Sequence, residues 1–188
     1  MRFSPWDIDT SALANISILT MAAETDDELG SVLRFHLATE SILSFYISEK
    51  TQGEISKYVK EPRDFGTKLS IATALGLPLP LARVIHQINA IRNKLAHKPD
   101  TSINDGDLKE MARCVNKLSE IDVNFVPLEK LYIELPVKFP NQKISFGTNG
   151  NRIDFMLAGL AFYRSAVQWV VQDAAFRRAA DIAKELRP

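Results

Sequence analysis

Cysteine is nearly absent from this chain, since Cys114 is the single one among 188 residues. One thiol cannot form an intramolecular disulfide, and most structural zinc sites need several cysteines. Glycine is scarce as well, at 8 residues, and no Gly/Ser-rich linker or internal repeat divides the chain. These absences predict a single domain over residues 1–188 in a reducing cytoplasm.

Long apolar runs and cofactor motifs are also missing. Residues 1–7 lack the apolar core of a signal peptide, and the most apolar stretch, residues 155–171, is interrupted by Arg164 and Gln168. We therefore expect no membrane segment. The chain has no glycine-rich phosphate loop and no Cys/His cluster at metal-ligand spacing, so we expect no cofactor and no metal.

The chain has no excess charge of either sign. Its 23 basic and 23 acidic residues give a formal net charge of zero and an isoelectric point near 6.8. A protein that binds duplex DNA through its backbone normally carries a broad basic surface, so we expect no direct duplex binding. A small local phosphate site remains compatible with this composition.

What the sequence does contain is helical periodicity. Helices are expected over residues 9–23, from a Thr25/Glu28 capping box to about residue 50, over 64–75, over 81–97, from 105 or 107 to about 121, and over 153–186. Residues 122–152 lose this period and predict an irregular loop or short hairpin, because Leu131–Leu135 alternates. The fold class is therefore all-α, a bundle of about five to six helices.

The expected helix over residues 81–97 has two unlike faces. At 100° per residue, its apolar side chains fall on one face: Val84, Ile88, Ile91 and Leu95. The opposite face is a narrow polar stripe: His86, Asn89, Asn93 and His97. Asn forms helices poorly, so this stripe indicates either a wet surface that tolerates it or a row of donors and acceptors lining a cleft or subunit interface.

The helix that ends near residue 50 carries His36 and Glu40 within its apolar stripe, one turn apart. A buried carboxylate needs a partner, so Glu40 should accept from His36 or reach a cation on a neighbouring helix. Arg92 is the attractive cation, since it borders the core face of its own helix. A carboxylate there would orient the guanidinium for a phosphate.

The same helix has a second apolar row: Phe35, Ile42 and Tyr46. Two apolar rows mean burial on two sides, and a homodimer face is one way to achieve that.

The most informative stretch is Arg92, Asn93 and His97 at the end of the fourth expected helix. An arginine can hold a phosphate, and a histidine can move a proton near neutral pH. Basic residues also collect at helix C-termini for a structural reason, because they complement the negative end of the helix dipole. Composition and spacing alone do not decide between a phosphate-binding, proton-transferring site and an ordinary basic helix end.

Three blocks in order resemble the HEPN superfamily: Leu33–Glu40, Phe65–Leu77 and Ile88–His97. The resemblance covers about residues 26–120 and is strongest to the branch that includes the mannitol operon repressor. It implies an all-α homodimer. In ribonuclease members, two Arg-x4-6-His motifs face each other across the dimer cleft.

Carried onto this chain, the resemblance gives roles to the motif residues. Arg92 would bind the scissile phosphate, Asn93 would be the polar residue after it, and His97 would act on the ribose 2′-hydroxyl of RNA. His36, Glu40, Asn89 and His86 would support the site. The implied activity is metal-independent RNA cleavage, as in a toxin or defence component.

Two features of the resemblance favour other functions. Members that pair with a nucleotidyltransferase antitoxin carry a tyrosine two residues after the histidine, and this chain has Pro99 there. The mannitol-repressor-like branch acts in transcription regulation through protein contacts. The alternative is therefore a non-catalytic regulatory or interaction protein with a protein partner, in which Arg92 and His97 serve binding or stability.

Overall fold

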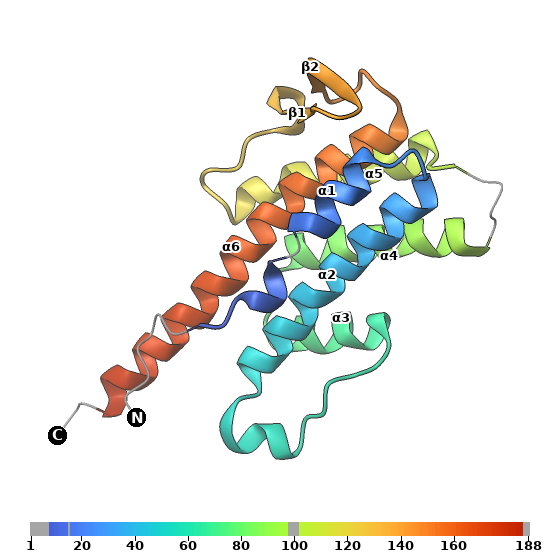
Figure 1. Ribbon diagram of the computed structural model, residues 1–188. Helices are drawn as coiled ribbons and strands as arrows, with labels where there is room; N and C mark the ends of the chain where they lie inside the picture. The colour runs from blue at the N-terminus through green and yellow to red at the C-terminus, as the bar shows by residue number, and fades with distance from the viewer. Residues whose placement is uncertain (1–7, 15, 98–101, 186–188) are drawn as a thin grey trace.

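The computed structural model describes residues 8–14, 16–97 and 102–185, and Pro99, which follows the fourth expected helix, lies outside them. Over these residues the chain is an all-α bundle with one small hairpin, as the sequence predicts (Figure 1). The helices are α1 (Ile16–Glu24), α2 (Glu28–Lys50), α3 (Phe65–Ala74), α4 (Leu79–His97), α5 (Asp105–Asn116) and α6 (Asn151–Glu185). Short 3-10 turns cover Ser11–Leu13, Gly53–Lys57, Lys117–Glu120 and Leu128–Lys130.

Helix α2 is the central element, because α1, α3, α4 and α6 all pack against it. Phe35 is fully buried and meets the rings of Phe155 and Tyr163 on α6 edge-on, with centroids 5.8 and 6.3 Å apart. Farther along α2, Tyr46 packs on Trp169 of α6 at 5.8 Å. The second apolar row of α2 is thus covered by the chain's own α6, and its interpretation as a homodimer face was wrong.

The helix boundaries differ from expectation where caps decide them. Helix α2 is capped by Asp27, whose Oδ1 accepts from the backbone N of Gly30 at 2.9 Å, and not by the Thr25/Glu28 box. Glu28 instead accepts from the backbone N of Ile103. Helix α4 begins at Leu79 and contains Pro80, since a proline in the first turn removes no helical hydrogen bond.

Two expected helices are shorter than predicted. The segment over residues 9–23 splits into the turn Ser11–Leu13 and α1. Helix α5 ends at Asn116, and its last expected turn is the 3-10 segment Lys117–Glu120.

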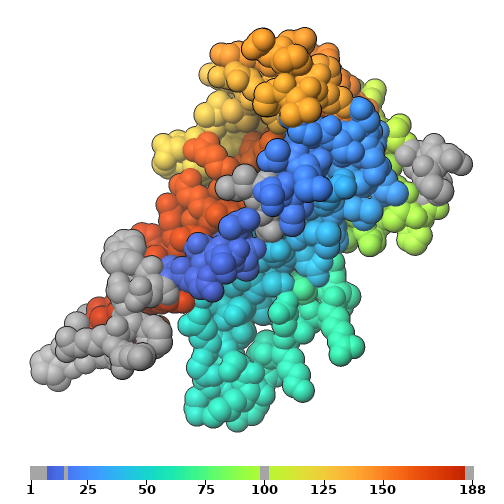
Figure 2. Space-filling view, in the orientation of Figure 1, coloured from blue at the N-terminus to red at the C-terminus, as the bar shows by residue number. Residues whose placement is uncertain are grey.

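The irregular segment contains an antiparallel hairpin of β1 (Tyr132–Leu135) and β2 (Phe139–Ser145), in which Ile133 pairs with Ile144. It sits over the beginning of α6, where Asp154 accepts from the backbone N of Gly147 at 2.7 Å (Figure 1). The segment between α2 and α3 protrudes at the opposite end of the molecule (Figure 2). None of the helices in the described part of the chain could cross a membrane.

The contact between α2 and α6 predicts an unusual effect of a helix-favouring substitution. A Cβ added at Gly159 would lie 2.7 Å from the Phe35 ring, so Gly159→Ala should destabilise the protein by about 1–2 kcal/mol despite its better helix propensity. Chemical denaturation measures this change.

A matched control is Gly66→Ala on α3, where the nearest atom, Asp64 Oδ1, is 3.5 Å from the added Cβ. This variant should be neutral or stabilised by up to about 1 kcal/mol. Adding Phe35→Leu to Gly159→Ala should recover part of the loss. Equal stability of the two alanine variants would contradict the close packing of α2 on α6.

Candidate functional site

The two faces of α4 are placed as its periodicity predicts. The structure buries its apolar face: Val84, Ile88, Ile91 and Leu95. On the other side, His86 and His97 are exposed, and Asn89 and Asn93 are half-buried. Helix α4 contains no aspartate or glutamate, although the whole chain is neutral. Its outer face therefore has basic and amide groups but no carboxylate of its own.

Asn89 is explained by a buried histidine on α2. His36 is 6% exposed, and its Nε2 donates to Asn89 Oδ1 at 3.1 Å. The His36 ring stacks on Phe65 of α3 with centroids 4.0 Å apart. Burial lowers the pKa of His36, partly offset by the Asn89 hydrogen bond, and nearby Arg92 lowers it further. His36 is thus a neutral structural group that joins three helices.

Arg92 is held by its neighbour on the helix. Its Nη1 donates to Asn93 Oδ1 at 2.9 Å, while its Nε is buried and has no hydrogen-bond partner. In residues 8–14, 16–97 and 102–185, no carboxylate lies within ion-pair distance of this guanidinium. A half-buried cation is normally compensated by a carboxylate, so Arg92 retains an unused capacity to bind an anion.

The expected pair of Arg92 with Glu40 was wrong, as was a pair of His36 with Glu40. Glu40 instead binds Lys68 of α3, with Nζ and Oε1 2.9 Å apart, and the same Nζ lies 2.9 Å from Glu61 Oε1 and from Ser44 Oγ. Lys68 is only 8% exposed. Lys68 therefore takes the Glu40 carboxylate, and the Arg92 guanidinium is left without one.

His97 and Asn93 line an open pocket of about 510 Å³ between the end of α4 and the start of α5. The apolar wall is formed by Ile91, Leu95 and Ile103. On the polar side, Asn104 caps α5 through its Oδ1, which accepts from Asp107 N at 2.9 Å. Lys94 neutralises the Asp107 carboxylate at 2.5 Å. An exposed imidazole therefore stands beside a cavity with room for a ligand.

Arg92 and His97 do not meet within one chain. Five residues apart on a helix, their side chains leave the axis about 140° apart, and no hydrogen bond joins them. Asn93 lies between the two residues, since its Oδ1 accepts a hydrogen bond from Arg92 and its side chain lines the same pocket as His97. The structure thus brings Arg92, Asn93 and His97 to one end of α4.

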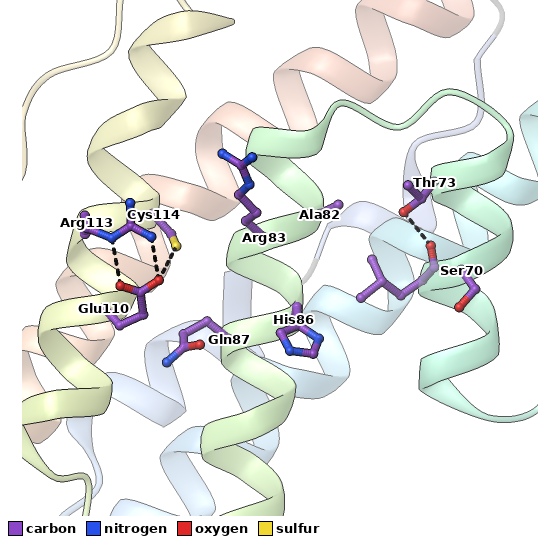
Figure 3. A pocket seen from close by; sticks show the side chains of 10 residues that line it. Ser70, Thr73, Ala82, Arg83, His86, Gln87, Glu110, Arg113 and Cys114 are labelled. Atoms are coloured by element: carbon purple, nitrogen blue, oxygen red, sulfur yellow. Dashed lines mark hydrogen bonds and ion pairs between the residues drawn. The ribbon is translucent and has the colours of Figure 1, made fainter.

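The other expected supporting residues are separate from this end. Glu40 lies in the Lys68 cluster, and His36 with Asn89 forms the buried pair. His86 lies three turns earlier on α4, in a different pocket between α3, α4 and α5 (Figure 3). Of the four supporting residues, only Asn89 and His36 contact each other.

Sequence reasoning missed the partners supplied by other helices. Phe65 and Lys68 lie on α3, outside the Arg-x4-His motif, and contact the expected supporting residues His36 and Glu40. A signal did exist for Lys68, which is the only charged residue in α3. A lone lysine in an otherwise uncharged helix suggests a buried carboxylate partner.

Within the described ranges, no three His, Cys, Asp or Glu side chains are grouped so as to hold a metal ion. Comparisons of the chain with family models, with curated proteins and with solved structures gave no match.

The buried pair predicts a pH dependence of stability. Because the pKa of folded His36 is below the ordinary value of 6.5, the unfolded chain binds a proton more readily between these two values. The free energy of unfolding should therefore fall as pH is lowered through this window. His36→Gln, which cannot titrate but can still bond Asn89, should lack this component in denaturation curves at several pH values.

The same pair predicts that substitution of Asn89 destabilises the protein more than substitution of Asn93. Asn89→Ala leaves the buried His36 Nε2 without a partner and should cost about 1–3 kcal/mol. Asn93→Ala only frees a half-buried guanidinium and should cost less. A larger loss for Asn93→Ala in thermal or chemical unfolding would contradict the assigned roles.

Proposed function

We propose that this protein is a metal-independent endoribonuclease of the HEPN type that acts as a homodimer. The observation that carries the proposal is the Arg92 guanidinium, which is half-buried, held by Asn93 and not compensated by any carboxylate in the described part of the chain. The exposed His97 beside its pocket supplies the second group that the chemistry needs.

An uncompensated guanidinium near a protein surface is suited to phosphate. Its planar fork of N–H donors matches two phosphate oxygens, and charge-assisted bonds of this kind are stronger than neutral ones. The Arg92 Nε is buried and has no partner, so the guanidinium keeps hydrogen-bonding capacity that no described protein group uses. Asn93 fixes the other side of the fork, so the group is oriented before the ligand arrives.

The chemistry proposed is attack by a ribose 2′-hydroxyl on its own phosphate. An imidazole takes the 2′-hydroxyl proton, the 2′ oxygen bonds to phosphorus, and the bond from phosphorus to the 5′ oxygen breaks. The departing 5′ oxygen takes a proton from solvent water. His97 acts as general base or acid, and Arg92 stabilises the negative charge that develops on the phosphate. DNA lacks the 2′-hydroxyl and is not a substrate.

The geometry of one chain favours a site shared by two copies. Because Arg92 and His97 leave α4 in directions about 140° apart, one copy presents them poorly to a single phosphate. A two-fold axis near the end of α4 would bring the arginine of one copy towards the histidine of the other.

Substitutions at the motif should separate activity from folding. His97→Ala should lower RNA cleavage in EDTA by about 10²-fold or more, because general acid–base help contributes on this scale. Thermal unfolding should change little, since His97 is exposed at a helix end. Arg92→Ala should also lose cleavage, whereas Arg63→Ala, an exposed arginine outside α4, is the matched control and should not.

A well-folded dimer that cleaves no RNA would contradict the proposal and favour the regulatory alternative.

Mixing two inactive variants tests whether the site is shared. If each site uses Arg92 of one copy and His97 of the other, random pairing of Arg92→Ala and His97→Ala chains should restore about one quarter of wild-type activity. The measurement is the cleavage rate after the two proteins are unfolded together and refolded. No recovery in a mixture that contains heterodimers would show that each site belongs to one chain.

A further inference from the structure

The outer face of α4 continues beyond the Arg92–His97 end to a second pocket. This pocket has a volume of about 560 Å³ and lies between α3, α4 and α5. Arg83 and His86 enter it from α4, and Arg113 and Glu110 line the α5 side (Figure 3). Its floor includes the apolar side chains of Leu69 and Ala82.

The charges in this pocket do not cancel. Glu110 is neutralised by Arg113, with Nε–Oε2 and Nη2–Oε1 distances of 2.7 and 2.6 Å. That pair holds the pKa of Glu110 down at about 2, so the carboxylate stays ionised and engaged. Arg83 is exposed and forms no hydrogen bond or ion pair with any residue that the structure describes. One unopposed positive charge is therefore left in the pocket.

The second pocket and His97 share one face of α4. Arg83 and His97 project within about 40° of each other around the α4 axis, whereas Arg92 projects about 180° from Arg83. Arg83 precedes His97 by fourteen residues, which is roughly 21 Å along the helix. Since α4 has no acidic residue, no charge of its own would repel a polyanion along this face.

We propose that the second pocket binds a phosphate of the same single-stranded RNA whose 2′-hydroxyl is activated by His97 of the same copy, while Arg92 of the other copy holds the scissile phosphate. This inference rests on the proposed function, because it needs RNA as the substrate. Arg83 is the binding residue, and the Arg113–Glu110 pair forms the opposite wall. Phosphate contacts position a strand without reading its bases, so this pocket contributes affinity and register but no sequence preference. A flexible single strand can follow the helix face from one pocket to the other.

The test measures binding of an unstructured, fluorescently labelled oligoribonucleotide by anisotropy over a series of salt concentrations. The parent protein carries His97→Ala so that the strand is not cut. Adding Arg83→Gln should weaken binding about threefold to tenfold at low salt and reduce the slope of log affinity against log salt by about 0.7, the loss of one single-strand phosphate contact. Adding Arg63→Gln instead removes an exposed charge elsewhere and should change neither quantity.

The outcomes separate the two proposals. If the parent binds RNA and Arg83→Gln behaves like Arg63→Gln, the second phosphate contact is overturned while the proposed nuclease function stands. If the parent binds no RNA at any salt concentration, the proposed function fails, and the second contact fails with it. Unfolding temperatures of both arginine variants should match the parent, since Arg83 has no partner among the described residues, so weaker binding cannot be attributed to misfolding.

Discussion

The hydrogen bond between His36 and Asn89 fixes the rotation of α4 against α2, and the placement of the candidate site depends on that rotation. His36 is buried, neutral and stacked on Phe65, so the bond cannot shift without exposing or unpairing an imidazole. With Asn89 turned inward, Arg92 falls at the edge of the core and His97 falls outside it. A rotation of α4 by one residue would bury His97 or expose Ile91.

Periodicity could predict the helices and the position of the hairpin, because both depend on local patterns. The apolar face of α4 and the loss of helical period after α5 are visible in single stretches of sequence. The N-cap of α2 was harder to predict. Asp27 and Thr25 are both good N-cap residues, and only the path of the folded chain decides between them. The start of α4 was hard to predict for a similar reason, because a proline such as Pro80 either precedes a helix or occupies its first turn.

The site could be predicted only in part, because pairing between helices is not a local property. Sequence reasoning found that Glu40 and His36 needed partners, but Lys68 and Asn89 supply them from α3 and α4. This pairing matters for the proposed function. Had Glu40 bound Arg92 as expected, the guanidinium would be neutralised. Because Lys68 takes the carboxylate, the arginine is left with one amide oxygen and no carboxylate partner among the described residues, and the proposed phosphate site depends on this.

The central claim is that Arg92 and His97 promote attack of a ribose 2′-hydroxyl on the adjacent phosphate. Mass spectrometry of the ends left on an oligoribonucleotide, after incubation with the purified protein in EDTA, tests this claim most directly. The account predicts fragments with a 2′,3′-cyclic phosphate on one side of the cut and a 5′-hydroxyl on the other. Fragments with a 5′-phosphate, or an intact strand, would contradict it.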